Sequence, residues 1–360
     1  MPTIPVDESG TVVYYEDSGE PEGSHTYLTV VLIHGILFHG AIFKNLIPHA
    51  AANNLRLIRV NQRDYPGSTP YSAQELETIA SNDFERRAVL LQTIGNQLST
   101  LVVNLAKELH LPPISIVGSK RSGGVALSTW SMGNCLALAM LSNASSLPAQ
   151  VRQDVAKYMR TLVMLDPVAG TTMGGTPSQG TYHPFRDPTL PIQERVDRAQ
   201  FWLSFYFTKV VDLESVTTEV LESRVAQHEQ LGLLQASSAK TPTLLRMSSA
   251  ELESAKDRAA LLRSSLPLLR SNSENFRLNF EKALFDTDGV LPSVNVVVAW
   301  CDETMGDAVF AAKIIHDRLK AEQPAGKVRR NIEMYRLEGM NHFPHCDFPE
   351  KVIEMFTNAL

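Results

Sequence analysis

Ser131 stands in a sequence context that would make it a nucleophile. It lies in Thr129-Trp130-Ser131-Met132-Gly133, which joins a β-like run at 124–128 to an apolar, helix-favouring run at 134–141. A serine at such a junction lies at a helix N-terminus, where free backbone N–H groups stabilise a developing negative charge. The stretch matches the G-x-S-x-G nucleophile elbow, except that Thr129 replaces the first glycine. We therefore predict that Ser131 is a nucleophile, in preference to a serine that only caps a helix.

Acyl transfer by a serine also needs a base, and His342 is the histidine best placed to be one. It follows the last β-like run, at 332–337, and precedes a predicted helix at 349–360, so that its loop can fold over the edge of a sheet. His345 is a nearby competitor, but its position is less suitable. The spacing of these two histidines and Cys346 fits no common zinc site, and we expect neither a metal nor another cofactor.

Two backbone N–H groups are predicted to bind the oxyanion. His34-Gly35-Ile36 directly follows an apolar run at 27–33, and Gly35 would allow the chain to turn sharply there. The Ile36 N–H would then join that of Met132, the residue after the candidate nucleophile, in an oxyanion hole.

The elements that must position these residues alternate between strand-like and helix-like segments. The β-like runs are at 10–16, 27–33, 55–60, 125–130, 161–165, 294–300 and 332–337. Helix is predicted at 43–52 and over a long amphipathic segment at 82–109. This alternation indicates an α/β fold with a mainly parallel, doubly wound sheet. The polar, glycine-rich stretch at 118–124 is predicted to be a loop.

Residues 170–285 break this alternation. The interval opens with Gly, Thr, Ser and Pro and favours helix from residue 192 onward. We interpret 170–285 as a helical cap inserted after the sixth strand, and 1–169 with 286–360 as the core that carries it. The alternative is a set of connecting helices that only cover the sheet.

Over nearly its whole length the chain resembles the α/β-hydrolase superfamily. The resemblance rests on His34-Gly35 after the third strand, residues 61–68 after the fourth, the elbow at Ser131, and residues 339–342, Gly-Met-Asn-His. The chain looks most like capped fungal serine hydrolases of the esterase, lipase or lactonase type. The resemblance implies a mostly parallel, eight-stranded sheet flanked by helices. A serine at position 131 argues against the epoxide hydrolases and dehalogenases of this fold, which use Asp there.

The resemblance leaves several candidates for the acid that orients the base. In most family members this acid follows the seventh strand in a W-G-x-x-D pattern, and Thr304 falls where that Asp is expected. Asp302 or Glu303 could serve from a slightly shifted loop. Asp166 ends the sixth strand in Leu-Asp-Pro, which resembles the segment of lipases that carry their acid there. We take Asp166 first, then Asp302, then Glu303; the alternative role for Asp166 is to cap a turn.

The substrate pocket is predicted to be aromatic. The cluster at 201–207 would form an apolar wall of the cap, although packing between helices would explain it as well. The predicted lining is Phe38, His39, Trp130, Phe201 and Phe205.

Composition excludes several classes of function. The chain has 360 residues, of which 44% are hydrophobic, and its net charge of −6 argues against nucleic acid as a partner. No apolar run approaches the roughly 20 residues that span a bilayer, and residues 1–8 do not resemble a signal peptide. Three cysteines do not form a disulfide framework. We expect a cytoplasmic protein without stable membrane insertion, whose partner is a small-molecule ester or lactone.

Three functions are compatible with these features. The first is hydrolysis of a carboxylic ester or lactone through an acyl-enzyme on Ser131. The second is an acyltransferase or cyclising enzyme that uses the same residues but excludes water. The third is a catalytically silent small-molecule-binding protein on the same scaffold.

Overall fold

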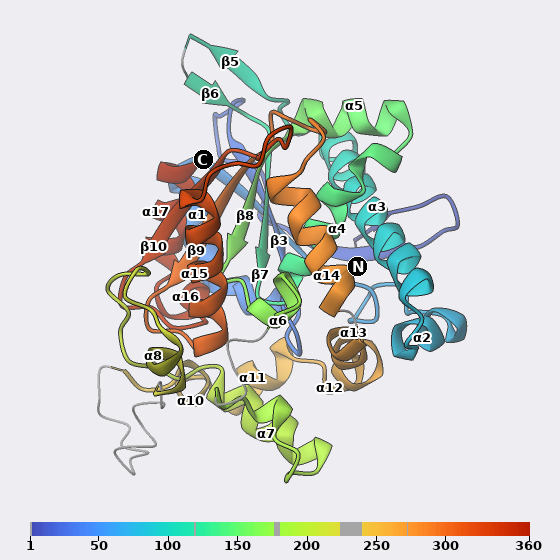
Figure 1. Ribbon diagram of the computed structural model, residues 1–360. Coiled ribbons are helices and arrows are strands. Elements are labelled where there is room, and N and C mark those ends of the chain that lie inside the picture. Colours follow the sequence, from blue (N-terminus) through green and yellow to red (C-terminus); the bar gives the residue numbers. More distant parts are fainter. Residues whose placement is uncertain (1, 119, 176–180, 224–239, 272) are drawn as a thin grey trace.

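A computed structural model describes the chain except for residues 1, 119, 176–180, 224–239 and 272 (Figure 1). Its centre is an eight-stranded sheet with the order β1-β2-β4-β3-β7-β8-β9-β10. The strands are β1 (Thr3–Pro5), β2 (Val12–Asp17), β3 (Leu28–Ile33), β4 (Leu55–Val60), β7 (Val125–Trp130), β8 (Met159–Leu165), β9 (Asn295–Cys301) and β10 (Ile332–Leu337). Strand β2 pairs antiparallel with both β1 and β4, and all other pairs are parallel.

The seven β-like runs of the sequence are confirmed as β2, β3, β4, β7, β8, β9 and β10. The two central strands, β3 and β7, are buried at every residue, as expected of parallel strands covered on both faces. The run at 118–124 is not a plain loop, because β5 (Ser115–Val117) pairs antiparallel with β6 (Lys120–Ser122). Gly118, whose φ is 63°, adopts the left-handed conformation that lets the chain reverse there.

Helices cover the sheet and its carboxyl edge. They are α1 (Ile47–Ala50), α2 (Ala73–Ala80), α3 (Phe84–Glu108), α4 (Gly133–Ser142), α5 (Ala149–Tyr158), α6 (Ala169–Thr172), α7 (Ile192–Trp202), α8 (Thr218–Glu222), α10 (Thr243–Arg246), α11 (Ser249–Ala255), α12 (Arg258–Ala260), α13 (Leu266–Ser271), α14 (Ser273–Phe280), α15 (Gly306–Lys320), α16 (Pro344–Asp347) and α17 (Pro349–Ala359). Shorter 3-10 or π turns are η1 (Gly40–Leu46), η2 (Ala51–Asn53), η3 (Ala144–Ser146), η4 (Pro184–Arg186), η5 (Leu261–Ser265) and η6 (Glu281–Phe285). Among the described residues, no helix has the length and apolar character that a membrane crossing requires.

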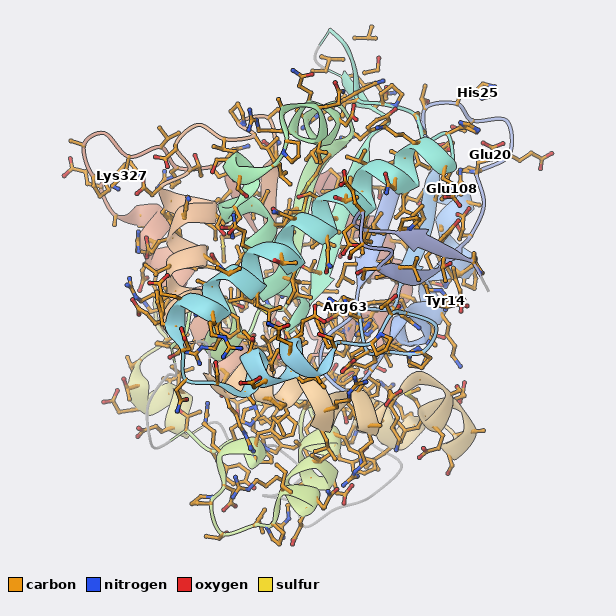
Figure 2. All side chains as sticks on the ribbon, turned by 90° about the vertical axis from the view of Figure 1, so that its right-hand side faces the viewer. Tyr14, Glu20, His25, Arg63, Glu108 and Lys327 are labelled. Atoms are coloured by element: carbon orange, nitrogen blue, oxygen red, sulfur yellow. The ribbon has the colours of Figure 1, made fainter. Side chains whose placement is uncertain are left out.

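The long helix α3 and the short helix α4 form one layer with α5 and α14 (Figure 1). The Asp83 side chain accepts the Arg86 N–H at 3.0 Å and so starts α3 within two residues of its predicted beginning. Figure 2 shows α3 lying diagonally across this face of the molecule. Because α4 directly follows Ser131, the packing of α3 on α4 helps to fix the candidate nucleophile.

The interval between β8 and β9 has two parts. Helices α7, α8 and α10 to α13 gather below the carboxyl edge of the sheet, at the bottom of both views (Figures 1 and 2). Helix α14 instead packs against α4, and Phe276 and Phe280 lie in the main hydrophobic core. Residues 176–180, 224–239 and 272 of the predicted cap lie outside the described residues.

Gly95 sets the distance between α3 and α4. A Cβ atom at this buried position would lie 2.6 Å from the backbone carbonyl carbon and oxygen of Ala139. A Gly→Ala change in a helix normally stabilises it by about 0.5–1 kcal/mol. We predict that Gly95→Ala instead lowers the free energy of unfolding by about 1–3 kcal/mol, because the helices must separate.

Denaturant unfolding of Gly95→Ala checks this prediction. Thr93→Ala, on the exposed side of the same helix, is the matched control and should change the free energy of unfolding little. A Gly95→Ala protein that is as stable as the wild type, or more stable, would contradict the close approach of the two helices.

Candidate active site

Ser131 lies on a sharp turn between β7 and α4. Its φ is 55°, in the left-handed region that a residue with a side chain adopts only when its surroundings enforce it. The Ser131 N–H donates to the carbonyl oxygen of Leu165 at 3.1 Å, which ties the turn to β8. Gly133 must be small, because a Cβ there would lie 2.7 Å from the His34 carbonyl oxygen. The close packing of this turn therefore enforces the strained conformation of Ser131.

Thr129 takes part in this turn through its side chain. Its hydroxyl is fully buried and donates to Asn134 Oδ1 at 2.8 Å. Asn134 Nδ2 in turn donates to the Ser131 carbonyl oxygen at 2.8 Å. A threonine can therefore replace the first glycine of the G-x-S-x-G pattern here, because its buried hydroxyl has a hydrogen-bond acceptor.

The structure brings Ser131, His342 and Asp166 together from three different parts of the chain. His342 Nε2 lies 2.9 Å from Ser131 Oγ, and His342 Nδ1 lies 2.6 Å from Asp166 Oδ2. Exposure is 6% for Ser131, 1% for His342 and 0% for Asp166, so water does not compete for these hydrogen bonds. The resting arrangement therefore has Nδ1–H donating to the carboxylate and Nε2 accepting the serine hydroxyl proton.

Two further groups donate hydrogen bonds to the Asp166 carboxylate. The Cys301 N–H donates to its Oδ1 at 2.9 Å, and the Thr304 hydroxyl donates to its Oδ2 at 2.6 Å. Three donors, counting His342, stabilise the ionised form of a carboxylate that is completely buried. Thr304, which occupies the position where the sequence pattern expects an acid, therefore contacts Asp166, the first of the three candidate acids.

Asp302 and Glu303 form ion pairs with basic side chains and do not contact His342. Asp302 is buried and accepts hydrogen bonds from Arg336 at 2.7 and 3.0 Å and from the Gly339 N–H at 2.7 Å. Glu303 pairs with Lys240. Both carboxylates therefore have partners other than the imidazole.

The loop that carries His342 is held by residues that the sequence reasoning did not single out for this purpose. Trp130 Nε1 donates to the His342 carbonyl oxygen at 2.8 Å. Asn341 Nδ2 donates to the Ser204 carbonyl oxygen at 2.7 Å and to Thr243 Oγ1 at 2.8 Å. Asn341 is adjacent to His342 in the sequence, but its role in anchoring this loop becomes visible only from its buried hydrogen bonds to these two acceptors.

Ile36 and Met132 line a cavity that Ser131 also lines. Neither N–H has an acceptor among the described residues. A Cβ on Gly35 would lie 2.9 Å from Ser131 Cβ, so glycine is needed for the two segments to approach. Burial lowers the pKa of His34 to about 3, and its Nδ1–H donates to the Gly35 carbonyl oxygen at 2.8 Å. Backbone N–H groups without an acceptor, from residues that share a cavity with a serine, are the kind of donors that could bind an oxyanion.

This cavity has a volume of about 320 Å³, which suits a small ligand. Its lining is mostly apolar and includes Ile36, Met132, Val168, Phe185, Leu203, Leu266, Leu269 and Met305; its polar lining includes Ser131, Thr171, His183, Arg186, Arg270, Ser273 and Asp307. No group of three or more His, Cys, Asp or Glu side chains among the described residues is arranged to hold a metal ion.

The five predicted pocket residues are not among the lining of this cavity. Phe38 is buried in an aromatic cluster, with ring centroids 6.1 Å from Trp130 and 5.5 Å from Phe343. His39 begins η1 by accepting the Ala41 N–H. Phe201 and Phe205 pack with the main core. Their aromatic character therefore reflects packing around the site.

Comparisons with known proteins add evidence on the fold. No protein-family model matches the sequence, and a search of curated proteins gives no match. A bromoperoxidase from Bacillus anthracis is 14% identical over 99% of this chain and 97% of its own, with a TM-score of 0.51. A putative aryl esterase from Burkholderia cenocepacia is 16% identical over the same shares, also at 0.51. A laboratory-evolved potato epoxide hydrolase is 14% identical over 99% and 98%, at 0.54. The chain has the α/β-hydrolase fold.

Within the α/β-hydrolase fold, Asp302 has a structural role that can be tested. Removing its charge leaves Arg336 with no acidic partner among the described residues except the exposed Glu338, 3.8 Å away, beside its hydrogen bond to the Val211 carbonyl oxygen at 2.8 Å. We predict that Asp302→Asn lowers the free energy of unfolding by about 3–5 kcal/mol, as expected when one partner of a buried ion pair is lost. Glu338→Gln is the matched control on the same arginine and should cost less than about 1 kcal/mol. Equal effects of the two changes in denaturant unfolding would refute the assignment.

Proposed function

We propose that the chain is a serine hydrolase that cleaves a carboxylic ester or lactone through an acyl-enzyme on Ser131. The observation that carries this proposal is the continuous hydrogen-bonded chain from Asp166 through His342 to Ser131 Oγ. The nearby esterase and epoxide hydrolase structures support the scaffold only, because their sequence identity is 14–16%. The proposal therefore rests on the geometry of this site.

The first half of the reaction forms the acyl-enzyme. Ser131 Oγ attacks the carbonyl carbon while His342 Nε2 removes the hydroxyl proton. The carbonyl oxygen becomes an oxyanion and accepts the N–H groups of Ile36 and Met132. Asp166 keeps the imidazole in the Nδ1–H tautomer and stabilises the imidazolium. The bond to the leaving oxygen then breaks, and Nε2 returns the proton to the departing alcohol.

The second half of the reaction releases the acid. Water attacks the acyl carbon as His342 Nε2 removes one of its protons, and the same two N–H groups bind the second oxyanion. The bond to Ser131 Oγ then breaks, and the serine regains its proton from Nε2. Replacement of water by an alcohol would give acyl transfer with the same groups. We propose that the segment between β8 and β9 acts as the cap, since it supplies His183, Phe185, Leu203 and Leu269 to the cavity.

Labelling and kinetics of three variants test this function. We expect Ser131→Ala to abolish both labelling by a fluorophosphonate probe and hydrolysis of p-nitrophenyl esters. Asp166→Asn should reduce kcat by roughly 10³–10⁴-fold, because the imidazole loses the carboxylate that sets its tautomer. Asp302→Asn, assayed below its unfolding temperature, should keep kcat within about tenfold of wild type, since a group outside the hydrogen-bonded chain acts only indirectly.

Several results would reject the proposal. Labelling that persists in Ser131→Ala would mean that another residue is the nucleophile. A folded wild-type protein that is never labelled but binds small ligands would indicate a silent binding protein. Product analysis with competing alcohols separates hydrolysis from acyl transfer.

Thr304 offers an independent test of the acid. Thr304→Val keeps the shape of the side chain but removes the donor to Asp166 Oδ2. We predict that kcat falls by about tenfold or more while KM changes little, because hydrogen bonds to charged groups are worth about 1.5–3 kcal/mol. Thr304→Ser restores the donor and should recover most of the rate. Equal kcat values for the valine and serine variants would contradict a role for the hydroxyl.

A further inference from the structure

The charged side chains around the Ser131 cavity do not cancel. Arg186 and Asp307 neutralise one another, with Arg186 Nη1 and Nη2 lying 2.7 and 3.2 Å from the two carboxylate oxygens. The Asp307 side chain is only 2% exposed, so this pair is a fixed part of the wall. A bidentate pair of this kind leaves little net charge for a ligand.

His183 adds no charge to the cavity at neutral pH. Burial lowers its pKa to about 4, so the imidazole is neutral. Its Nδ1 accepts the Phe185 N–H at 3.2 Å, which leaves the proton on Nε2. His183 is therefore a neutral hydrogen-bond donor in the wall.

Arg270 is the charged residue of this wall that has no acidic partner among the described residues. It belongs to α13, a helix below the carboxyl edge of the sheet (Figure 1). Arg270 is exposed. Leu266 and Leu269 of the same helix also line the cavity, so Arg270 borders an apolar part of the wall. An arginine side chain stays protonated at any physiological pH. The cavity thus has one permanent positive charge that nothing in the described protein compensates.

We propose that the substrate is an ester that also carries a free carboxylate, and that Arg270 binds this carboxylate while Ser131 attacks the ester. This inference rests on the proposed function. The planar guanidinium fork matches the two oxygens of a carboxylate. A phosphate monoester carries a charge of about −1.5 to −2, which one guanidinium does not neutralise. The apolar remainder of the cavity would hold the carbon chain between the two groups.

Matched pairs of esters test the proposal. Mono-p-nitrophenyl suberate is compared with p-nitrophenyl octanoate, so that the carboxylate lies on the acyl side. 3-Acetoxybenzoate is compared with its methyl ester, so that the carboxylate lies on the alcohol side. We expect the wild type to prefer the carboxylate in at least one pair by roughly tenfold or more in kcat/KM, as one charge-assisted bidentate contact would give. The preference should decrease as salt is added.

Variants of Arg270 show whether this residue is the cause. Arg270→Gln should lose the preference through a higher KM for the carboxylate-bearing esters, and Arg270→Lys should keep part of it. Arg277→Gln on the neighbouring helix α14 is the matched control, because it removes the same charge from an exposed arginine that does not line the cavity. The proposal is overturned if wild type shows no preference in either pair, if the preference survives in Arg270→Gln, or if phosphate-bearing esters are preferred.

A binding measurement separates this inference from the proposed function. Suberate should raise the melting temperature of Ser131→Ala, and the added Arg270→Gln change should remove that shift. Binding that depends on Arg270 without any ester cleavage would reject the serine chemistry and keep the carboxylate site. Cleavage of neutral esters without binding of suberate would reject the carboxylate site and keep the serine chemistry.

Discussion

The buried carboxylate of Asp166 is the group on which the rest of the site depends. It is completely inaccessible to water and therefore needs several donors to remain ionised. Those donors are His342 Nδ1, the Thr304 hydroxyl and the Cys301 N–H, which come from two segments far apart in the sequence. One side chain thus joins the end of β8 to the end of β9 and to the loop after β10. Any shift between these segments would leave a buried charge without a partner.

The sheet explains why an acid after β8 can take the place of one after β9. The two strands are parallel neighbours, and Leu165, one residue before Asp166, pairs with Ala299. The carboxyl ends of adjacent parallel strands meet at one edge, so side chains from either strand reach the same position. Asp166 has a φ of 42°, and its N–H donates to the Ala299 carbonyl oxygen at 2.7 Å. This local turn holds the carboxylate beside Thr304.

Much of the fold could be predicted from the sequence, and Asp166 is the first candidate for the acid, but the sequence alone could not decide among the three candidate acids or give the lining of the pocket. The periodicity of the strands and the glycines at positions 35 and 133 depend on the backbone conformation of short segments, and such local features can be recognised directly in a sequence. The choice among Asp166, Asp302 and Glu303 depends on which cations lie nearby, and Arg336 is 34 residues from Asp302 along the chain. The pocket depends on how the helices between β8 and β9 pack. Aromatic residues such as Phe205 look the same in a sequence whether they line a cavity or fill a core.

The loop of His342 and the segment between β8 and β9 share the same anchors. Asn341 donates to the carbonyl oxygen of Ser204 and to Thr243, and Asp347, at the end of α16, accepts the hydroxyls of Tyr206 and Thr243 at 2.6 Å. The loop is therefore anchored both just before His342 in the sequence, at Asn341, and a few residues after it, at Asp347. The segment that supplies Leu203 to the cavity therefore also supplies the anchors of the His342 loop. The packing of this one segment thus bears both on the shape of the cavity and on the position of the imidazole.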